Sequence, residues 1–131
     1  MSAIAGVAHV ALTVRDADRS AQWYSDLLGM QVVMKADEDT VRFRILAQPE
    51  SGVVIGLRQY PEYQDGAFDE FRTGLDHISF RVPSRQDLEE WQQRLREAGV
   101  HFTPIVDTPT GSVIVFRDPD NIQLEFFVVT E

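Results

Sequence analysis

The sequence predicts an α+β fold in which two βαβββ modules follow one another within a single domain of 131 residues. The first observation is an internal repeat: residues 6–14 (GVAHVALTV) align with residues 74–82 (GLDHISFRV) at a constant offset of 68. The offset persists beyond these segments, since Trp23 then coincides with Trp91. The second observation is alternation of apolar and polar residues in the later segment, the pattern of a half-buried strand. Together they indicate two copies of one structural unit.

The first module covers about residues 5–60 and begins with a strand at 6–14. Asp16 or Asp18 offers an N-cap for the helix that follows, because a short acidic side chain accepts hydrogen bonds from the first turn. Gly29 closes that helix, since glycine tolerates the left-handed conformation found there. Alternation and turn-forming residues predict three further strands, at 31–36, 41–47 and 53–60.

The second module covers about residues 74–129 and repeats this order. Ser84 and Asp87 resemble a capping box at the start of its helix, which ends at Gly99. Three strands are then predicted, at 101–106, 112–117 and 122–129. Apolar residues at helical spacing in both modules indicate that each helix packs on one face of a sheet. We expect the helices on the convex face and the polar side chains on the concave face.

Residues 61–73 connect the modules and are long for a loop. They contain three aromatic residues, Tyr63, Phe68 and Phe71. The segment can be a simple connection that packs on its neighbours, or it can cover an active site. Simple packing is favoured because two modules must be joined in any case.

Composition excludes several classes of function. The net charge of −9, with Lys35 as the one lysine, argues against binding to nucleic acid or to an anionic membrane surface. The absence of cysteine excludes disulfides and thiolate chemistry. No apolar run approaches the ~18 residues of a membrane span, and the first residues lack a secretion-signal pattern. We therefore expect a cytoplasmic protein.

Three side chains that could bind a metal are predicted to converge on the concave face. In strand 122–129 the apolar residues alternate with Glu125, which then points to the same side as His77, and the repeat places His9 there too. Two imidazoles and one carboxylate suit a divalent transition metal that also binds substrate; Fe, Mn, Ni, Co and Zn are all compatible. The alternative is that each histidine is an ordinary hydrogen-bonded residue and that Glu125 is solvated.

Other residues of the concave face could act on a substrate. Arg58 and Arg81 suit a carboxylate, a phosphonate or an enediolate oxygen, because guanidinium groups bind such oxygens bidentately. The alternative is that both arginines pair with acids at the rim. With Ser79 they form the candidate catalytic set, and no site for an organic cofactor is predicted.

The two modules, the paired histidines and the segments WYSDLLGM (23–30) and FRDPDNIQLEFF (116–127) resemble the vicinal oxygen chelate superfamily. This superfamily includes glyoxalase I, extradiol dioxygenases, fosfomycin-resistance proteins and bleomycin-resistance proteins. The resemblance covers essentially the whole chain and implies open, cup-shaped mixed sheets. It also implies that His9, His77 and Glu125 hold the metal.

The resemblance implies a small metal-dependent enzyme, a dioxygenase or a lyase/transferase, acting on a small oxygen-rich substrate. One departure concerns Gly56, which the repeat places opposite Glu125, where glyoxalases and epimerases carry a further ligand or base. Glycine cannot serve either role, which argues against those two activities. The fosfomycin enzymes and dioxygenases usually have a tyrosine where Val115 stands, so no named activity fits every position.

Two further expectations follow from the resemblance. The rival function is a metal-free binding protein of the bleomycin-resistance type that sequesters a small molecule. Members of similar size usually form homodimers in which module one of one chain faces module two of the other. We therefore expect a homodimer with sites at the interface, where His9 shares a metal with His77 and Glu125 of the second copy.

Overall fold

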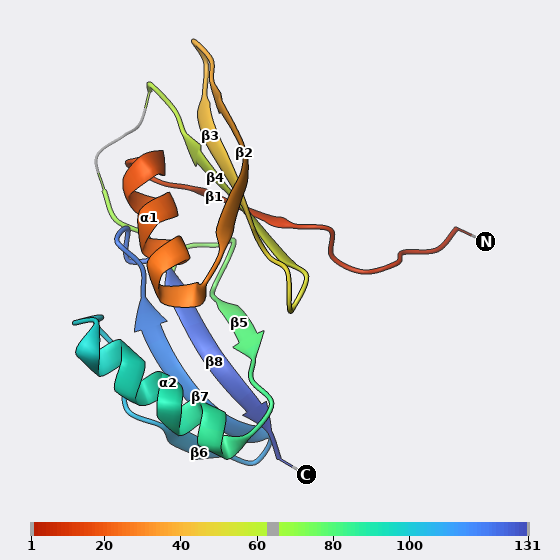
Figure 1. The fold of residues 1–131 in the computed structure, drawn as a ribbon, viewed down its shortest axis with the longest axis vertical. Helices are drawn as coiled ribbons and strands as arrows, with labels where there is room; N and C mark the ends of the chain where they lie inside the picture. Colours follow the sequence, from red (N-terminus) through yellow and green to blue (C-terminus); the bar gives the residue numbers. More distant parts are fainter. Residues whose placement is uncertain (1, 63–65, 131) are drawn as a thin grey trace. The chain divides into compact units, whose positions relative to one another are not determined.

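The computed structural model describes residues 2–62 and 66–130, which form two compact units divided between residues 65 and 66. Each unit has one helix and one four-stranded mixed sheet, in the order βαβββ (Figure 1). The predicted α+β fold of two repeated modules is therefore confirmed. None of the described helices is long and apolar enough to cross a membrane.

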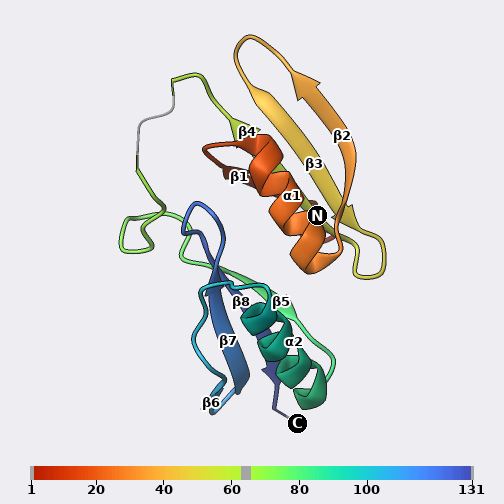
Figure 2. The same ribbon diagram turned by 60° about the vertical axis from the view of Figure 1, so that its left-hand side comes forward.

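The first unit consists of β1 (Val10–Thr13), α1 (Ala17–Leu28), β2 (Gln31–Asp37), β3 (Arg42–Gln48) and β4 (Val53–Gln59). Its strand order is β1-β4-β3-β2, with β1 parallel to β4 and the other pairs antiparallel. The second unit consists of β5 (Ile78–Arg81), α2 (Arg85–Glu97), β6 (Val106–Thr108), β7 (Gly111–Arg117) and β8 (Gln123–Val129). Its order, β5-β8-β7-β6, reproduces the first (Figure 2).

Both helices begin where the sequence predicts and α1 also ends there, whereas α2 ends at Glu97, with Ala98 as its C-cap, just before the predicted Gly99. Asp16 is the N-cap of α1 and accepts a hydrogen bond from the backbone N–H of Arg19, at 3.0 Å from its Oδ1. Gly29 closes this helix at φ 66°, a left-handed conformation that glycine adopts without a Cβ penalty. Ser84 caps α2 by accepting from the N–H of Asp87. Local sequence therefore determines the ends of α1 and the start of α2.

The core of each unit lies between its helix and one face of its sheet. In the first unit Tyr24 of α1 is fully buried, as are Leu46 and Leu57 of the strands. In the second unit Trp91 of α2 stacks on Phe126, with ring centroids 4.3 Å apart. Because the helix covers one face, the alternate residues of each strand point to the uncovered face.

The first strand of each module is shorter than predicted. The paired strands are Val10–Thr13 and Ile78–Arg81, instead of 6–14 and 74–82. Gly6 and Gly74 adopt positive φ values of 137° and 144°, which extended strands do not contain. His9 and His77 consequently lie directly before their strands, at equivalent positions in the two units.

The strand predicted at 101–106 is wrong in position, because the paired segment is Val106–Thr108. Residues 101–103 still contact β7 through single bonds, such as Thr103 N–H to the Val115 carbonyl at 2.8 Å. Pro104 follows and has no N–H to donate, so a regular ladder cannot run through this segment.

The described part of the 61–73 connection packs against the second unit. The Phe68 N–H donates to the Asp120 carbonyl at 2.9 Å, and the Asn121 side chain donates to the Phe68 carbonyl at 3.0 Å. Glu70 forms a bidentate ion pair with Arg117, at 3.0 and 2.7 Å. These contacts agree with a packed connection. Phe71 is 93% exposed, and Tyr63 lies outside the described residues.

Candidate metal and substrate site

The second unit brings together two of the three predicted metal ligands. His77 precedes β5 and Glu125 lies in β8; the two strands are parallel neighbours in which Ser79 pairs with Glu125. The Nε2 atom of His77 is 3.5 Å from Oε1 of Glu125. This separation exceeds that of a good N–H···O hydrogen bond. It is close to the ~3.4 Å expected between two ligands of one tetrahedral ion with bonds of ~2.1 Å.

The orientation of His77 is set by its other ring nitrogen. Nδ1 lies 2.7 Å from Oδ1 of Asp76, and the same oxygen accepts from Nε2 of Gln123 at 3.1 Å. A carboxylate at Nδ1 places the proton on that atom and leaves the Nε2 lone pair facing Glu125. Histidines that bind metals in proteins are usually held in this way.

A chain of polar contacts extends from this pair to the connecting segment. Arg117 donates from Nη2 to Oε1 of Gln123 at 3.1 Å, and the same nitrogen donates to Oε2 of Glu70 at 2.7 Å. The hydrogen bond from the Arg117 guanidinium holds the pKa of Glu70 at about 2, well below its usual 4.5. Glu70 is therefore a carboxylate throughout the neutral range, and the position of Gln123 is fixed from two sides.

Glu125 offers a carboxylate to a positively charged partner. Its side chain is only 16% exposed, and within the described part of the second unit no hydrogen-bond donor contacts it apart from the distant His77 nitrogen. A cation beside a partly buried carboxylate interacts with it more strongly than it would in open water. Among the described residues, no three His, Cys, Asp or Glu side chains form a group that could hold a metal ion.

The third predicted ligand, His9, lies in the first unit. Strand register identifies the residue of that unit that is equivalent to Glu125. Ala11 of β1 pairs with Gly56 of β4 as Ser79 pairs with Glu125, so Gly56 is the structural counterpart of Glu125. The sequence alignment of the two modules predicted this equivalence. Gly56 does not have positive φ, and a Cβ there would meet Ala11 only in ordinary contact at 3.5 Å. The backbone therefore does not require glycine.

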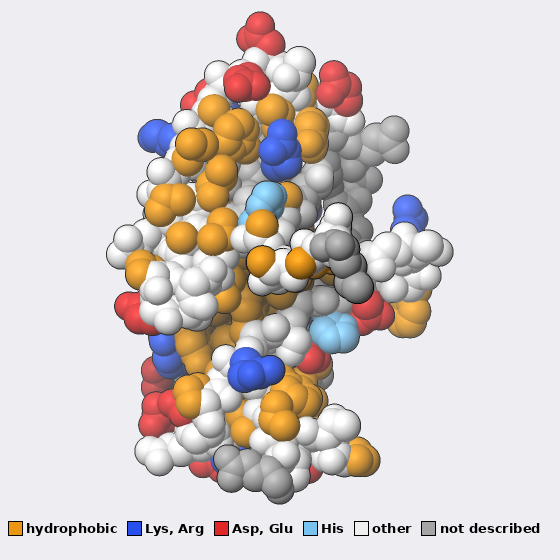
Figure 3. Space-filling model, turned by 90° about the vertical axis from the view of Figure 1, so that its right-hand side faces the viewer, with side chains coloured by type: hydrophobic (Ala, Val, Ile, Leu, Met, Phe, Trp, Pro, Cys, Tyr) orange, Lys and Arg blue, Asp and Glu red, His pale blue; other side chains and the backbone are white. Residues whose placement is uncertain are grey.

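A pocket of about 200 Å³ lies on the uncovered face of the first sheet. His9, Ala11, Gly56 and Arg58 line it together with the apolar side chains of Phe43, Ile45 and Val54. Arg44, which is paired with Asp18 and Asp37, also lines it. Figure 3 shows hydrophobic side chains gathered over the strands of this unit, with a histidine and a basic side chain among them. The pocket is thus mainly apolar with a few polar groups, as small-molecule sites usually are.

The three candidate catalytic residues all lie in strands, but their environments differ. Arg58 donates from Nε to the Tyr60 hydroxyl at 2.9 Å and lies over the Phe43 ring, 5.4 Å from its centroid. Ser79 and Arg81 are exposed residues of β5. Within the described part of each unit, neither arginine pairs with an acid, so the alternative of rim ion pairs is not what the structure shows.

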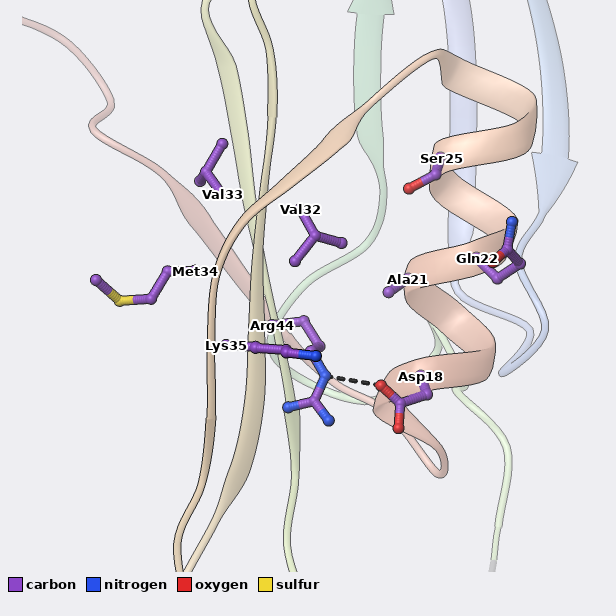
Figure 4. Close-up of a pocket in the computed structure, with 9 residues that line it drawn as sticks. All are labelled: Asp18, Ala21, Gln22, Ser25, Val32, Val33, Met34, Lys35 and Arg44. Carbon is purple, nitrogen blue, oxygen red and sulfur yellow. Dashed lines mark hydrogen bonds and ion pairs between the residues drawn. The ribbon is translucent and has the colours of Figure 1, made fainter.

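A larger, open hollow of about 560 Å³ lies between α1 and β2, and His9 does not line it (Figure 4). Its buried charge is neutralised: Nε of Arg44 is 2.7 Å from Oδ1 of Asp18, and Nη1 is 2.9 Å from Asp37. The hydrogen bond from Arg44 lowers the pKa of Asp18, and the Asp18 carboxylate raises the pKa of Arg44. With Arg44 paired to two acids, this open hollow is a poorer candidate than the smaller pocket.

Sequence reasoning missed Asp76 and Gln123. Gln123 lies two positions before Glu125, so alternation could have placed it on the same face. Asp76 directly precedes His77, and alternation would place the two on opposite faces; their contact forms because both residues lie before the regular strand. Sequence reasoning also did not single out Tyr60. Its hydrogen bond to Arg58 links residues two apart in the chain, a spacing at which strand side chains share a face.

Comparisons with known proteins agree on one family. The model of the Glyoxalase/Bleomycin resistance protein/Dioxygenase superfamily matches residues 6–126. A crystal structure of a glyoxylase/bleomycin resistance protein/dioxygenase domain from Frankia sp. EAN1pec is 42% identical. The alignment covers 98% of this chain and 95% of that one, with a TM-score of 0.91.

Among curated proteins, uncharacterized protein YwkD of Bacillus subtilis is 30% identical, with 91% of this chain and 93% of YwkD covered. Metallothiol transferase FosB of Staphylococcus saprophyticus is 27% identical, with 97% and 79% covered. Four curated relatives named as dioxygenases or putative dioxygenases are longer, and the chain spans between 38% and 60% of their length.

Proposed function

Because the chain belongs to the Glyoxalase/Bleomycin resistance protein/Dioxygenase superfamily, we propose that it is a metal-dependent enzyme acting on a small oxygen-rich molecule. His9, His77 and Glu125 are the proposed ligands. The observation that supports this most directly is the pair in the second unit: His77 turns Nε2 toward Glu125, a largely buried carboxylate that no other donor contacts among the residues of that unit that the structure describes.

The donor set fits a divalent transition metal. Nitrogen from neutral imidazole and oxygen from carboxylate suit Fe, Mn, Ni, Co and Zn, and three protein ligands leave open positions for substrate. When bound, such an ion supplies Lewis-acid stabilisation of a negatively charged oxygen. The protein's own contribution is to hold the ligands: Asp76 fixes the His77 ring, and Gln123 fixes Asp76.

The reaction class follows from what the first unit lacks. A base or fourth ligand at the position equivalent to Glu125 would come from β4, where Gly56 stands. Proton abstraction by a residue at that position is therefore excluded. The family name and the similarity to a metallothiol transferase support dioxygenase or transferase chemistry, in which a metal held by His9, His77 and Glu125 would supply Lewis-acid stabilisation to the substrate's oxygens.

The site is proposed to form in a homodimer, from His9 of one copy and His77 with Glu125 of the other. This is supported by the division of the ligands: the first unit holds one histidine, and the second holds the histidine–carboxylate pair. Two identical sites related by a two-fold axis would result, because a dimer of this kind uses the same surface on both copies.

Metal analysis of untagged protein tests the proposal. We expect close to one equivalent of a transition metal per chain, and less than about a tenth of an equivalent in His77→Ala. Arg85→Ala is a suitable control, since Arg85 lies on α2 and pairs with Asp107. Less than a tenth of an equivalent in the wild-type protein, unchanged by His77→Ala, would instead identify a metal-free binding protein.

A further inference from the structure

The pocket of the first unit has a second polar group, Arg58, whose binding capacity is only partly used. Its Nε donates to the Tyr60 hydroxyl, and its plane lies over the Phe43 ring. Among the residues that the structure describes, no hydrogen-bond acceptor contacts the two terminal nitrogens. The guanidinium is thus held on one edge and one face. Its remaining N–H groups can donate to the two oxygens of a carboxylate.

Strand register places the lining residues in three successive rows across the sheet. Thr13, Arg58 and Phe43 form one row, and Ala11, Gly56 and Ile45 form the next. His9 precedes Val10, which pairs with Ile55, so His9 lies level with Val54 in the third row. Rows two residues apart are ~6.6 Å apart, which places the backbones at Arg58 and His9 ~13 Å apart.

The middle row carries no polar side chain. Ala11 and Ile45 flank Gly56, where the missing side chain leaves the space of the pocket open. Since the backbone at Gly56 would accept a side chain, the consequence of glycine here is room for a ligand. A ligand that reaches from His9 to Arg58 therefore needs an apolar middle about as large as one ring or a branched carbon chain.

We propose that this pocket binds a small organic acid whose carboxylate is held by Arg58 and whose apolar body lies over Gly56. Its opposite, oxygen-bearing end faces His9. The volume of about 200 Å³ suits one ring with short substituents. Tyr60 is a positioning residue that orients the guanidinium. The inference rests on the proposed function only for the end at His9, whereas the carboxylate and apolar parts depend on the first unit alone.

The test compares two probes of the same shape, 3-phenylpropanoate and its neutral amide, on metal-depleted protein by NMR titration. We expect the acid to bind about tenfold more tightly than the amide, as a charge-assisted bidentate contact predicts. Arg58→Met should reduce this preference to less than about twofold, and Arg58→Lys should restore part of it. Arg42→Met, which removes an arginine of β3 that pairs with Asp37, should retain the preference.

The apolar part of the proposal has its own variant. Gly56→Val should weaken binding of both probes about tenfold, and Gly56→Ala should do so to a smaller degree with the fold intact. Equal affinity for acid and amide, an unchanged preference in Arg58→Met, or no binding of the acid at millimolar concentration would each overturn the inference. Acid binding retained in a wild-type protein that takes up no metal would contradict the proposed function and leave this inference standing.

Discussion

At the scale of single residues, the candidate site depends on how His77 is held. The ring is oriented by Asp76, which in turn accepts from Gln123. A histidine without such a partner can rotate and can carry its proton on either nitrogen. The contact therefore fixes both the direction and the tautomer of the proposed ligand before any metal binds.

Removing this contact should weaken metal binding without removing a ligand. We expect Asp76→Ala to lower metal affinity by about 10–100-fold, the usual effect of losing such a partner. Gln123→Ala should have a smaller effect in the same direction. Competition titration with a chelator of known affinity measures both, and Asp107→Ala serves as a control acid of the same unit. If Asp76→Ala bound metal as tightly as the wild-type protein, the orienting role would be wrong.

Residue patterns indicated where the proposed ligands lie, but they did not indicate which side chains form hydrogen bonds with them. The repeat aligned His9 with His77, and alternation placed Glu125 beside the latter, as the 3.5 Å separation now shows. The same repeat identified Gly56 as the counterpart of Glu125, which strand register confirms. The partners of His77 and Arg58 were not predicted, because a hydrogen bond between side chains depends on rotamers that sequence spacing leaves open.

At the scale of elements, local chemistry explains which boundaries could be predicted. Helix ends are set within one turn by caps such as Asp16 and Gly29, so they were found correctly. Strand ends depend on whether a partner strand is present, which a single segment does not reveal. Residues 6–9 alternate as strands do, yet no neighbouring strand of the unit pairs with them. Before β6, Pro104 has no N–H to donate, so a regular strand ladder cannot run through that segment.

The connection between the units is fixed to the second unit by an ion pair that should respond to acid. Because Arg117 lowers the pKa of Glu70 to about 2 in the folded protein, the pair stabilises the fold above the carboxyl's unfolded value near 4.5. This stabilisation should be lost as the pH falls from about 4.5 to 2. Glu70→Gln lacks the group that titrates, so its unfolding temperature should fall less steeply over this range.

Thermal unfolding followed by circular dichroism at pH 7, 4 and 2.5 measures this difference. The wild-type protein should be the more stable of the two at pH 7, and the difference between them should be much smaller at pH 2.5. Asp69→Asn is a matched control: Asp69 also lies in the connection, but its contact with Arg72 is long, at 3.9 Å. Parallel pH profiles for the wild-type protein and Glu70→Gln would show that the Arg117 pair does not contribute.

At the scale of the whole molecule, the two units share one topology but carry different side chains. Both have the same strand order and a histidine before their first strand, but only the second has a carboxylate in its last strand. The first has the apolar pocket and Arg58 instead. The proposed site combines the metal ligands of one unit with the pocket of the other, and the proposal that two chains share each site rests on this division.

A complementation experiment tests whether the sites are shared. His9→Ala and Glu125→Ala should each lose metal as pure proteins, because every site then lacks one ligand. After the two are mixed, partly unfolded and refolded, heterodimers form. If His9 of one copy joins His77 and Glu125 of the other, one site of each heterodimer collects both substitutions and the other collects neither. Metal binding should then return to about half of the heterodimer sites.

Mass spectrometry of the intact complexes counts the heterodimers. If they are present and bind no metal, each site is built from a single chain, and the shared arrangement is wrong.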